Sequence, residues 1–318
     1  MNLLVTGGCG FIGSNFIQYV LNKKLRSVHK IVNFDCLSYA GNEKNVDGFE
    51  NDPKYIFIKG NLKNYSEVFD AVYKHDITHI MHLAAESHVD NSIIAPDVFI
   101  ESNIIGTFNL LKVVRQLNVK RLHHVSTDEV YGELGKKGKF KETTPYDPRN
   151  PYSASKASAD MLARAFFHTY KLNVTLSNCC NNYGPRQHEE KFMPTVIDSL
   201  MHDIAVPVYG DGKNVRDWIY VEDHCHALWK ILKKGEKGET YNVGANCEKS
   251  NLEIVKKICD VLGKNFRSSV KFVKDRPGHD FRYAIDNKKI TSDLKWKPNH
   301  NFEEAIKKTV KWYKSECK

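Results

Sequence analysis

Hydrophobic and polar residues alternate in two different rhythms along the first part of the chain. Short, almost continuously apolar runs predict strands buried on both faces of a parallel sheet, whereas apolar residues at every third or fourth position predict amphipathic helices. The predicted strands are Leu3–Thr6, Lys30–Asp35, Tyr55–Lys59, His79–Ala85, Arg121–Thr127 and Asn173–Cys179. The helical patterns between them are Ile12–Leu21, Ser66–Lys74, Asp97–Leu117 and Pro151–Tyr170. This alternation predicts an α/β fold with a doubly wound parallel sheet and right-handed crossovers.

The rhythm changes after Tyr183-Gly184-Pro185, where the elements become shorter and turn residues more frequent. Helical patterns continue at Phe192–His202, Val221–Leu232, Leu252–Leu262 and Phe302–Lys314. We therefore expect a second, smaller α/β lobe toward the C-terminus. The predicted boundaries assign residues 1–184 and 214–238 to the sheet domain and residues 185–213 and 239–318 to the smaller lobe.

Composition restricts the class of protein. The 318 residues, 41% hydrophobic and 27% charged, suit about two ordinary globular domains and exclude a fibrous or intrinsically disordered chain. No apolar run approaches the roughly 18 residues of a membrane-spanning helix, and the first residues resemble a strand rather than a signal peptide. The eight cysteines form no C-x-x-C pair, which favours free thiols in a reducing compartment. We expect a cytoplasmic protein without membrane contact.

Charge and ligand patterns narrow the possible partners. The net charge of +9 favours an anionic partner such as a phosphate ester, although a solvated basic surface explains it equally well. The basic residues are scattered and are not interleaved with aromatic ones, so nucleic-acid binding is the weakest possibility. His224 and His226 stand two apart in a predicted helix, where side chains diverge, and we expect no metal site.

A glycine-rich turn follows the first predicted strand. Gly7, Gly10 and Gly13 form a G-x-x-G-x-x-G motif between that strand and the first helix. Such glycines allow a tight turn, close approach of a pyrophosphate and close helix packing, while the helix N-terminus supplies N–H donors. Asp35 ends the next strand, where a carboxylate accepts hydrogen bonds from ribose hydroxyls and repels a 2′-phosphate. The motif predicts a Rossmann-like domain that binds NAD rather than NADP.

The spacing Tyr-x-x-x-Lys occurs four times, at Tyr19/Lys23, Tyr55/Lys59, Tyr152/Lys156 and Tyr209/Lys213. Only Tyr152 and Lys156 open a helix beyond the switch point of the sheet, soon after a strand that ends in Thr127. Residues four apart share a helix face, so we expect the Lys156 ammonium, with the nicotinamide cation, to lower the pKa of the Tyr152 phenol from about 10 toward neutrality. A tyrosinate there removes the proton of a substrate hydroxyl while hydride leaves for NAD.

Two acids follow this strand, in Thr127-Asp128-Glu129. The carboxyl ends of strands are where ligands bind in open α/β sheets. A hydroxyl followed by two carboxyl groups offers more than an oxidation requires, because one acid can protonate a leaving hydroxyl while its neighbour removes a carbon-bound proton. Adjacent acids are also common on solvated loops, and the triplet alone does not decide between these readings.

At these motifs the sequence strongly resembles the extended short-chain dehydrogenase/reductase superfamily and, within it, the dTDP-glucose 4,6-dehydratase family. The resemblance covers nearly the whole chain and is carried by Thr6–Asn15, Leu83–Asp90, Ser126–Gly132, Pro151–Lys156, Asn181–Pro185, Arg216–Trp218 and Asp275–Asp280. The Thr-Asp-Glu triplet is the signature of this group, since epimerases of the superfamily lack the acid pair.

The resemblance implies that dTDP-glucose is dehydrated to dTDP-4-keto-6-deoxyglucose. In this scheme Tyr152 deprotonates the C4 hydroxyl, whose oxygen is bonded to Thr127, as hydride passes from C4 to NAD. Glu129 then removes the C5 proton, Asp128 protonates the departing C6 hydroxyl, and the hydride returns to C6. The resemblance also implies a homodimer built on the long helices predicted at 97–117 and 152–170.

The family pattern further implies which residues line each ligand. For the cofactor these are Gly7, Gly10, Phe11, Ile12, Gly13, Asp35, Cys36, Leu37, Ser38, Asn61, Leu62, Leu83, Ala84, Ala85, Ser102, Tyr152, Lys156 and Asn182. For the sugar nucleotide they are Ser87, Thr127, Asn181, Glu190, Lys191, Pro207, Val208, Tyr209, Arg216, Asn246, Cys247, Arg276 and His279. The cations among them suit a diphosphate, because guanidinium and ammonium groups pair with phosphate oxygens.

Departures from the family pattern leave alternatives open. Asn61-Leu62 replaces the usual Asp-Ile beside the adenine of the cofactor and keeps a polar group there. Cys247 stands where an asparagine often contacts the base of the sugar nucleotide, so UDP-glucose stays an alternative to dTDP-glucose. A 4-epimerase is a second alternative, whose product retains the C6 hydroxyl. A non-enzymatic NAD-binding scaffold is the third, and it has no need for the tyrosine, the lysine and both acids together.

Overall fold

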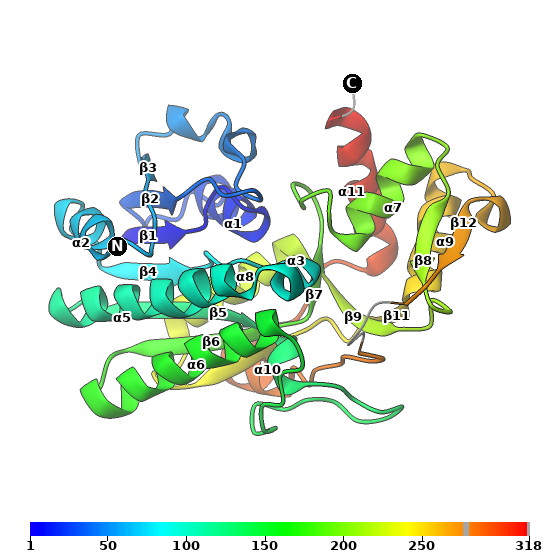
Figure 1. Ribbon diagram of the computed structural model, residues 1–318. Coiled ribbons are helices and arrows are strands. Elements are labelled where there is room, and N and C mark those ends of the chain that lie inside the picture. The colour runs from blue at the N-terminus through cyan, green and yellow to red at the C-terminus, as the bar shows by residue number, and fades with distance from the viewer. Residues whose placement is uncertain (276–279, 317–318) are drawn as a thin grey trace.

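The computed structural model describes residues 1–275 and 280–316. Its largest element is a seven-stranded, fully parallel sheet in the order β10-β6-β5-β4-β1-β2-β3 (Figure 1). The strands are β1 Asn2–Thr6, β2 Lys30–Asp35, β3 Tyr55–Lys59, β4 His79–His82, β5 Arg121–Thr127, β6 Val174–Cys179 and β10 Thr240–Val243. The chain direction across the sheet reverses between β1 and β4, which makes the gap between their carboxyl ends the topological switch point. The expected doubly wound α/β fold is confirmed.

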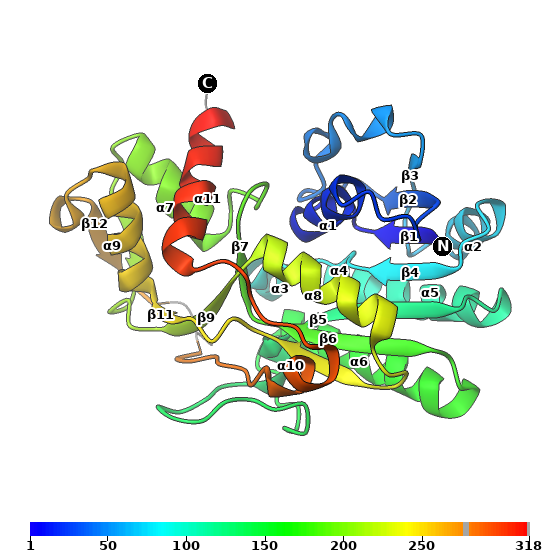
Figure 2. The same ribbon diagram turned by 180° about the vertical axis from the view of Figure 1, so that it is seen from behind.

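Helices cover both faces of the sheet, which explains why its strands are apolar on both sides. Within β1, Leu4 joins the core under α2, α5 and α6, whereas Leu3 and Val5 join the core under α1 and α8. The two layers are separate in the two views of the ribbon (Figures 1 and 2). These helices are α1 Phe11–Asn22, α2 Tyr65–Lys74, α5 Gly106–Gln116, α6 Pro151–Tyr170 and α8 Val221–Lys234.

Two predicted elements differ from the structure. Strand β4 ends at His82, because residues 83–88 leave the sheet to form a loop at its carboxyl edge. The helix predicted at 97–117 begins instead as α4 Pro96–Phe99, continues as a six-residue π-helical segment, Ile100–Ile105, and becomes α-helical again as α5. A π turn widens the helix by one residue per turn and is frequent at functional sites. Before it lies the short helix α3 Val89–Ile94.

The second lobe packs α7 Phe192–Met201, α9 Asn251–Leu262 and α11 Phe302–Glu316 around their own apolar core. Its two-stranded parallel sheet pairs β8 Val206–Tyr209 with β12 Val270–Val273. A three-stranded sheet, β11-β9-β7, pairs Glu248–Ser250, Val215–Tyr220 and Asn181–Tyr183. The short 3₁₀ segments of the chain are Glu43–Val46, Phe49–Asn51, Asp128–Tyr131 and Phe266–Ser268.

One stretch assigned to the second lobe belongs to the large sheet. Strand β10 lies within residues 239–318, yet it pairs in parallel with β6 and extends the sheet by one strand. Helix α10, Lys288–Leu294, which the sequence pattern did not predict, shares an apolar core with β10. The remaining domain boundaries stay a prediction. Within the described residues, no helix is both long and apolar enough to span a membrane.

Candidate active site

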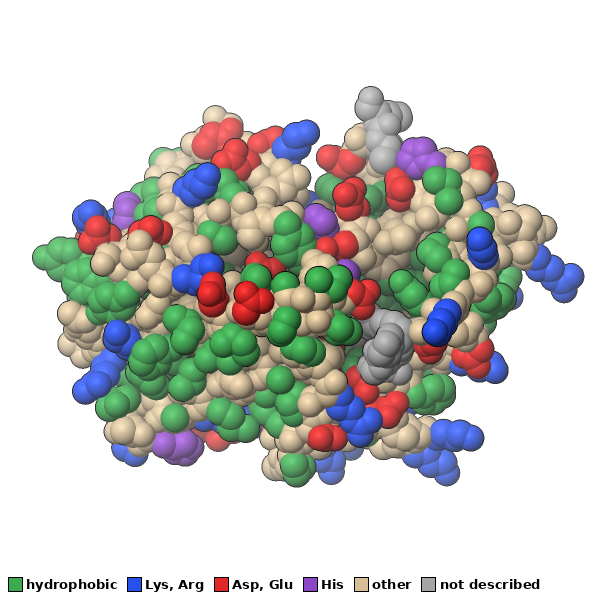
Figure 3. Space-filling model, in the orientation of Figure 1, with side chains coloured by type: hydrophobic (Ala, Val, Ile, Leu, Met, Phe, Trp, Pro, Cys, Tyr) green, Lys and Arg blue, Asp and Glu red, His purple; other side chains and the backbone are tan. Residues whose placement is uncertain are grey.

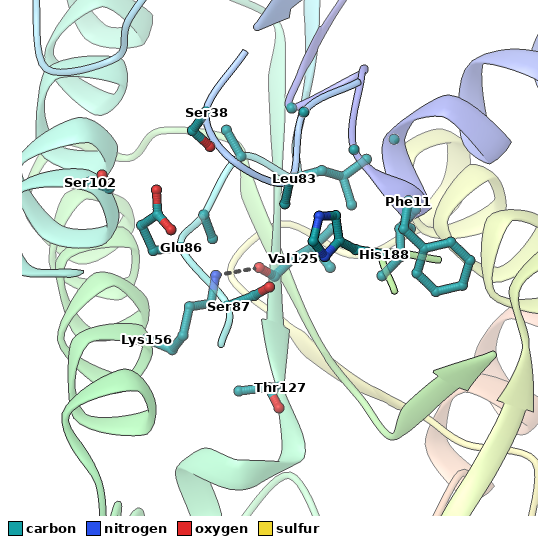
Figure 4. Close-up of a pocket in the computed structure, with 18 of the residues that line it drawn as sticks. Phe11, Ser38, Leu83, Glu86, Ser87, Ser102, Val125, Thr127, Lys156 and His188 are labelled. Atoms are coloured by element: carbon teal, nitrogen blue, oxygen red, sulfur yellow. Dashed lines mark hydrogen bonds between the residues drawn. The ribbon is translucent and has the colours of Figure 1, made fainter. Parts of the chain in front are cut away.

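A deep pocket opens at the carboxyl edge of the large sheet, next to the switch point. Its walls are the segments that directly follow β1, β2, β3, β4, β5 and β6, closed on the other side by residues 187–191 of the second lobe (Figure 4). The predicted cofactor residues on its walls are Gly7, Gly10, Phe11, Ile12, Gly13, Asp35, Cys36, Ser38, Asn61, Leu62, Leu83, Ala84, Ala85, Ser102, Tyr152, Lys156 and Asn182. Residues from distant parts of the sequence therefore meet in one cavity, as the strand order requires.

The glycine turn leaves no room for side chains. A Cβ on Gly13 would stand 2.0 Å from the carbonyl oxygen of Gly7, and a Cβ on Gly7 would stand 2.7 Å from the Cα of Ala84. Gly7 also has a φ of +73°, in the left-handed region that glycine adopts most readily. Gly10 precedes α1 without a side-chain cap, so the first N–H groups of the helix face the pocket as anion donors. This backbone cradle fits a dinucleotide pyrophosphate.

Asp35 stands at the end of β2 with its carboxylate held in place. One oxygen accepts from the Cys9 N–H at 2.9 Å and the other from the Leu37 N–H at 2.8 Å. Burial raises the pKa of Asp35, and these hydrogen bonds act in the opposite direction. Each carboxylate oxygen keeps a second lone pair, which suits the two hydroxyls of a ribose. Leu37, predicted beside the cofactor, does not line the pocket, because its side chain packs against the core under α1.

The acid pair lies on the 3₁₀ turn that follows β5. Thr127 caps this turn by accepting from the Glu129 N–H at 3.3 Å, and it also lies 3.5 Å from an Asp128 oxygen. Asp128 is almost fully buried, and its Oδ2 has no hydrogen-bond partner among the described residues. Burial, followed by the charges of Glu129 and Asp217, raises the Asp128 pKa well above its usual range. Asp128 therefore holds its proton to higher pH than an ordinary carboxyl group, while the less buried Glu129 lines the same pocket.

Tyr152 and Lys156 both line the pocket from the first turns of α6. The expected effect of Lys156 on Tyr152 is not found. Burial and then the Glu129 charge raise the pKa of Tyr152 well above 10, and a hydrogen bond with Thr127 only partly opposes them. The Lys156 ammonium donates instead to the Val125 carbonyl oxygen at 2.8 Å (Figure 4). Burial is thus the largest influence on the Tyr152 pKa.

The substrate-binding prediction divides into two groups. Ser87, Thr127, Asn181, Glu190 and Lys191 line the pocket. The Lys191 ammonium donates to the Ser87 carbonyl oxygen at 2.7 Å and so bridges the two lobes across the pocket. Pro207, Val208, Tyr209, Arg216, Asn246 and Cys247 do not line it. Arg276 and His279 lie outside the described residues.

The second group is held elsewhere by local packing. The strand β8 alternates, so the Val208 side chain packs in the core of the second lobe, and the predicted substrate contact of this residue stays a prediction. The buried Arg216 guanidinium donates to the carbonyl oxygens of Val215, Asp280 and Phe281. The Cys247 N–H donates to Asp217 at 2.7 Å.

Several lining residues were not predicted, among them Glu86, His188, Val125, Ser126, Cys179 and Cys180. Glu86 and His188 lie within two residues of predicted ones, so a wider window around each motif would have found them. Cys179 ends β6 and Cys180 follows it, and their place beside the pocket follows only from the strand order. His224, excluded above as a metal ligand, is buried on α8 and lies 2.8 Å from the Asn182 oxygen.

Comparison with known proteins agrees with this geometry. Residues 4–309 match the family model described as GDP-mannose 4,6 dehydratase. A dTDP-glucose 4,6-dehydratase of Xanthomonas campestris pv. campestris (strain B100) is 48% identical, with 98% of this chain and 92% of the relative covered. "dTDP-glucose 4,6-dehydratase 1" of Escherichia coli K12 is 45% identical, with 100% and 94% covered.

Solved structures show the same likeness. A Streptomyces venezuelae dTDP-glucose 4,6-dehydratase with NAD and TYD bound superposes with a TM-score of 0.96 at 41% identity, with 99% of this chain and 97% of that chain covered. A Thermotoga maritima UDP-glucose 4-epimerase with UDP-glucose reaches a TM-score of 0.92 at only 27% identity, with both chains fully covered. The fold is thus shared with epimerases, whereas the higher sequence identity is to dehydratases. The chain belongs to the nucleotide-sugar 4,6-dehydratase family, whose members include GDP-mannose and dTDP-glucose enzymes.

Proposed function

We propose that this protein is an NAD-dependent dTDP-glucose 4,6-dehydratase. The observation that carries the proposal is the acid pair in the pocket: Asp128 is buried in a site that raises its pKa well above the usual range, next to the less buried Glu129. Two carboxyl groups whose environments differ in this way suit the roles of general acid and general base. An epimerase needs neither group. The relatives' names support the thymidine nucleotide as the substrate.

The cofactor would be held by the glycine cradle at its pyrophosphate and by Asp35 at a ribose. When bound, NAD accepts a hydride from C4 of the sugar and returns it to C6. Leu62 and Asn61, which replace the usual pair after β3, lie on the same wall and keep a polar group beside the adenine. The cofactor is regenerated in every turnover and is expected to stay bound.

Residues of this chain move the protons. Tyr152 takes the C4 hydroxyl proton as a phenolate, a form that the nicotinamide cation of bound NAD would favour against the burial that raises its pKa, while Thr127, which is hydrogen-bonded to the phenol, binds the same sugar oxygen. The resulting ketone acidifies the C5 proton, which Glu129 removes. Asp128 gives its proton to the C6 hydroxyl, which leaves as water, and Glu129 returns its proton to C5 when C6 is reduced. Tyr152 then releases a proton to solvent and Asp128 takes one up, which restores both groups. The sequence of steps is oxidation, elimination and reduction with no net change in oxidation state.

Binding of the sugar nucleotide is assigned to the second lobe and to the loops at the pocket mouth. Ser87, Asn181, Glu190 and Lys191 stand on the pocket walls and are proposed to contact it. Arg216 is proposed to act on the diphosphate, and its charge already reaches Asp128. The roles of Pro207, Tyr209, Asn246 and Cys247 stay predictions.

We also propose a homodimer formed through the face made by α3, α4, the π segment, α5 and α6. Exposed large apolar side chains gather there, namely Ile93, Ile94, Val98, Ile100, Ile105, Phe108, Met161 and Tyr170. Hydrophobic groups are dense over α5 and α6 in the space-filling view (Figure 3). A patch of this kind marks a protein interface.

A cytoplasmic location is also part of the proposal. The seven described cysteines are unpaired, as is typical of proteins in a reducing compartment.

Substrate turnover tests the proposal. The purified protein is incubated separately with dTDP-glucose and UDP-glucose, and the product is examined by mass spectrometry. A dehydratase product is lighter by one water and carries a 4-keto group, whereas an epimerase product keeps the mass of its substrate. Faster conversion of dTDP-glucose supports the thymidine assignment, and conversion without loss of mass contradicts the dehydratase assignment.

A further inference from the structure

Four polar residues follow one face of α6 at intervals of four: Tyr152, Lys156, Asp160 and Arg164. Residues at this spacing are neighbours on a helix surface. Tyr152 and Lys156 line the pocket, whereas Asp160 lies one turn deeper, is fully buried and does not line it. A carboxylate in the core is costly unless it is hydrogen-bonded or paired with a charge. The proposed chemistry does not use Asp160, and its presence requires an explanation.

Three donors surround the Asp160 carboxylate. One oxygen accepts from the Ser126 hydroxyl at 2.8 Å and from the Tyr146 hydroxyl at 2.9 Å, and the other lies 3.0 Å from His124 Nε2. Burial lowers the pKa of His124, so this ring is neutral and donates an N–H rather than a charge. Its other nitrogen has no partner among the described residues, in agreement with a single-proton ring. Both oxygens of the buried Asp160 carboxylate therefore have hydrogen-bond partners.

Lys156 faces this carboxylate from the next turn of the helix. Burial lowers the pKa of Lys156, and the charge of Asp160 is the largest influence that raises it. The other titratable groups around Lys156 are His82 on β4, His124 on β5, Cys179 on β6 and Tyr152 on its own helix. Burial lowers the pKa of both imidazoles and raises that of the Cys179 thiol to about 12, so all three are uncharged near neutrality. Arg164, on the far side of Asp160, interacts with the same carboxylate.

We infer that Asp160 is a positioning residue for the proposed reaction: its buried carboxylate keeps the Lys156 ammonium charged and fixed on the Val125 carbonyl oxygen beneath the catalytic pocket. The inference rests on the proposed function, to which it adds a charged Lys156 one helical turn from Tyr152. Asp160 thereby joins the residues of the reaction, although it does not line the pocket that would hold cofactor and substrate. The hydrogen bonds from Ser126 and Tyr146 then hold the Asp160 carboxylate in place, one helical turn from Lys156.

The test is the pH dependence of kcat for Asp160→Asn, which removes the charge and preserves the shape. Without its counter-charge Lys156 loses its proton at lower pH, so the alkaline limb of the profile moves down by about one pH unit. Tyr146→Phe is the matched control, because it removes one hydrogen bond to the same carboxylate and no charge. Its profile is expected to keep the alkaline limb of the unmodified protein. A uniform loss of activity with an unshifted limb in Asp160→Asn overturns the inference.

A direct titration makes the test independent of turnover. Lysine side chains labelled with ¹⁵N are followed by NMR, with Lys156→Gln used only to assign the Lys156 signal. In Asp160→Asn, or in the smaller neutral variant Asp160→Ser if the first does not fold, Lys156 is expected to titrate at lower pH. An unchanged titration overturns the inference. A failure of the proposed function has a different signature: the unmodified protein then yields no dehydrated sugar, whatever the titration of Lys156 shows.

Discussion

The cofactor half and the substrate half of the pocket are built by different means. The cofactor half follows from contacts between neighbours in sequence: a strand, three glycines and a helix that together leave only backbone around the pyrophosphate site. The substrate half depends on segments far apart in the chain, such as residues 187–191, which reach the pocket from the second lobe. The comparison shows that a local sequence motif is enough to predict the cofactor site. Predicting the substrate contacts also requires knowing how the second lobe is placed relative to the large sheet.

The catalytic acids lie where the two halves meet, and the largest effect is expected there. Glu129→Gln should allow C4 oxidation but reduce water loss by about 10²–10⁴-fold, because the amide cannot accept the C5 proton. Reduced cofactor should then accumulate, which its near-ultraviolet absorbance reports.

Tyr152→Phe is the contrasting variant for the same experiment. It removes the group that takes the first proton, so neither reduced cofactor nor dehydrated product should form at an appreciable rate. Normal dehydration by the Glu129 variant, or unchanged turnover by the Tyr152 variant, would refute the respective role.

The cofactor half is tested by Gly13→Ala. The added methyl group would meet the Gly7 carbonyl oxygen, and overpacking of this kind costs about 1–3 kcal/mol, or roughly a 10–100-fold loss of NAD affinity. Calorimetric titration with NAD measures it. Gly135→Ala is the control, since nothing lies within 4 Å of a Cβ there. Equal affinity in the two variants would show that the cradle does not hold the cofactor.

The rate of the elimination step is also expected to depend on pH, because Asp128 lies where the cofactor half and the substrate half meet. Because burial raises the pKa of Asp128, its proton is retained to higher pH than that of an ordinary carboxyl group and is lost as the pH rises through that pKa. The elimination step should therefore slow by up to about tenfold per pH unit above the Asp128 pKa. Single-turnover formation of the dehydrated sugar, measured across pH, follows this step. A rate that rises steadily with pH is incompatible with Asp128 as the acid.

The smallest effect is expected in the substrate half. Cys247 lies outside the pocket walls and is held by its backbone N–H on Asp217, so Cys247→Ala should change the KM for dTDP-glucose by less than about threefold. The same variant should leave the preference for dTDP-glucose over UDP-glucose unaltered. A tenfold change in either quantity would indicate that the Cys247 side chain contacts the nucleotide base of the substrate, against the prediction that it lies outside the site.

The sequence predicted the sheet, most helices and the cofactor half because these depend on periodicity and on short motifs. Residues 240–243, which form β10, were assigned to the second lobe, because four residues carry no signal of which sheet they join. The burial of the Val208 side chain was not predicted, because it follows from the alternation of β8, which motif matching does not register. The high pKa of Tyr152 could not be predicted either, since it depends on burial created by residues from β5, β6 and α6 together.

The most direct test of the account follows one hydrogen atom. dTDP-glucose deuterated at C4 is converted by the purified protein in ordinary water, and the product is analysed by NMR for the position of the label. The account predicts that deuterium appears on the C6 methyl group, because the hydride removed from C4 is the one returned at C6. A product whose methyl group carries no deuterium, or whose label is still at C4, would contradict it.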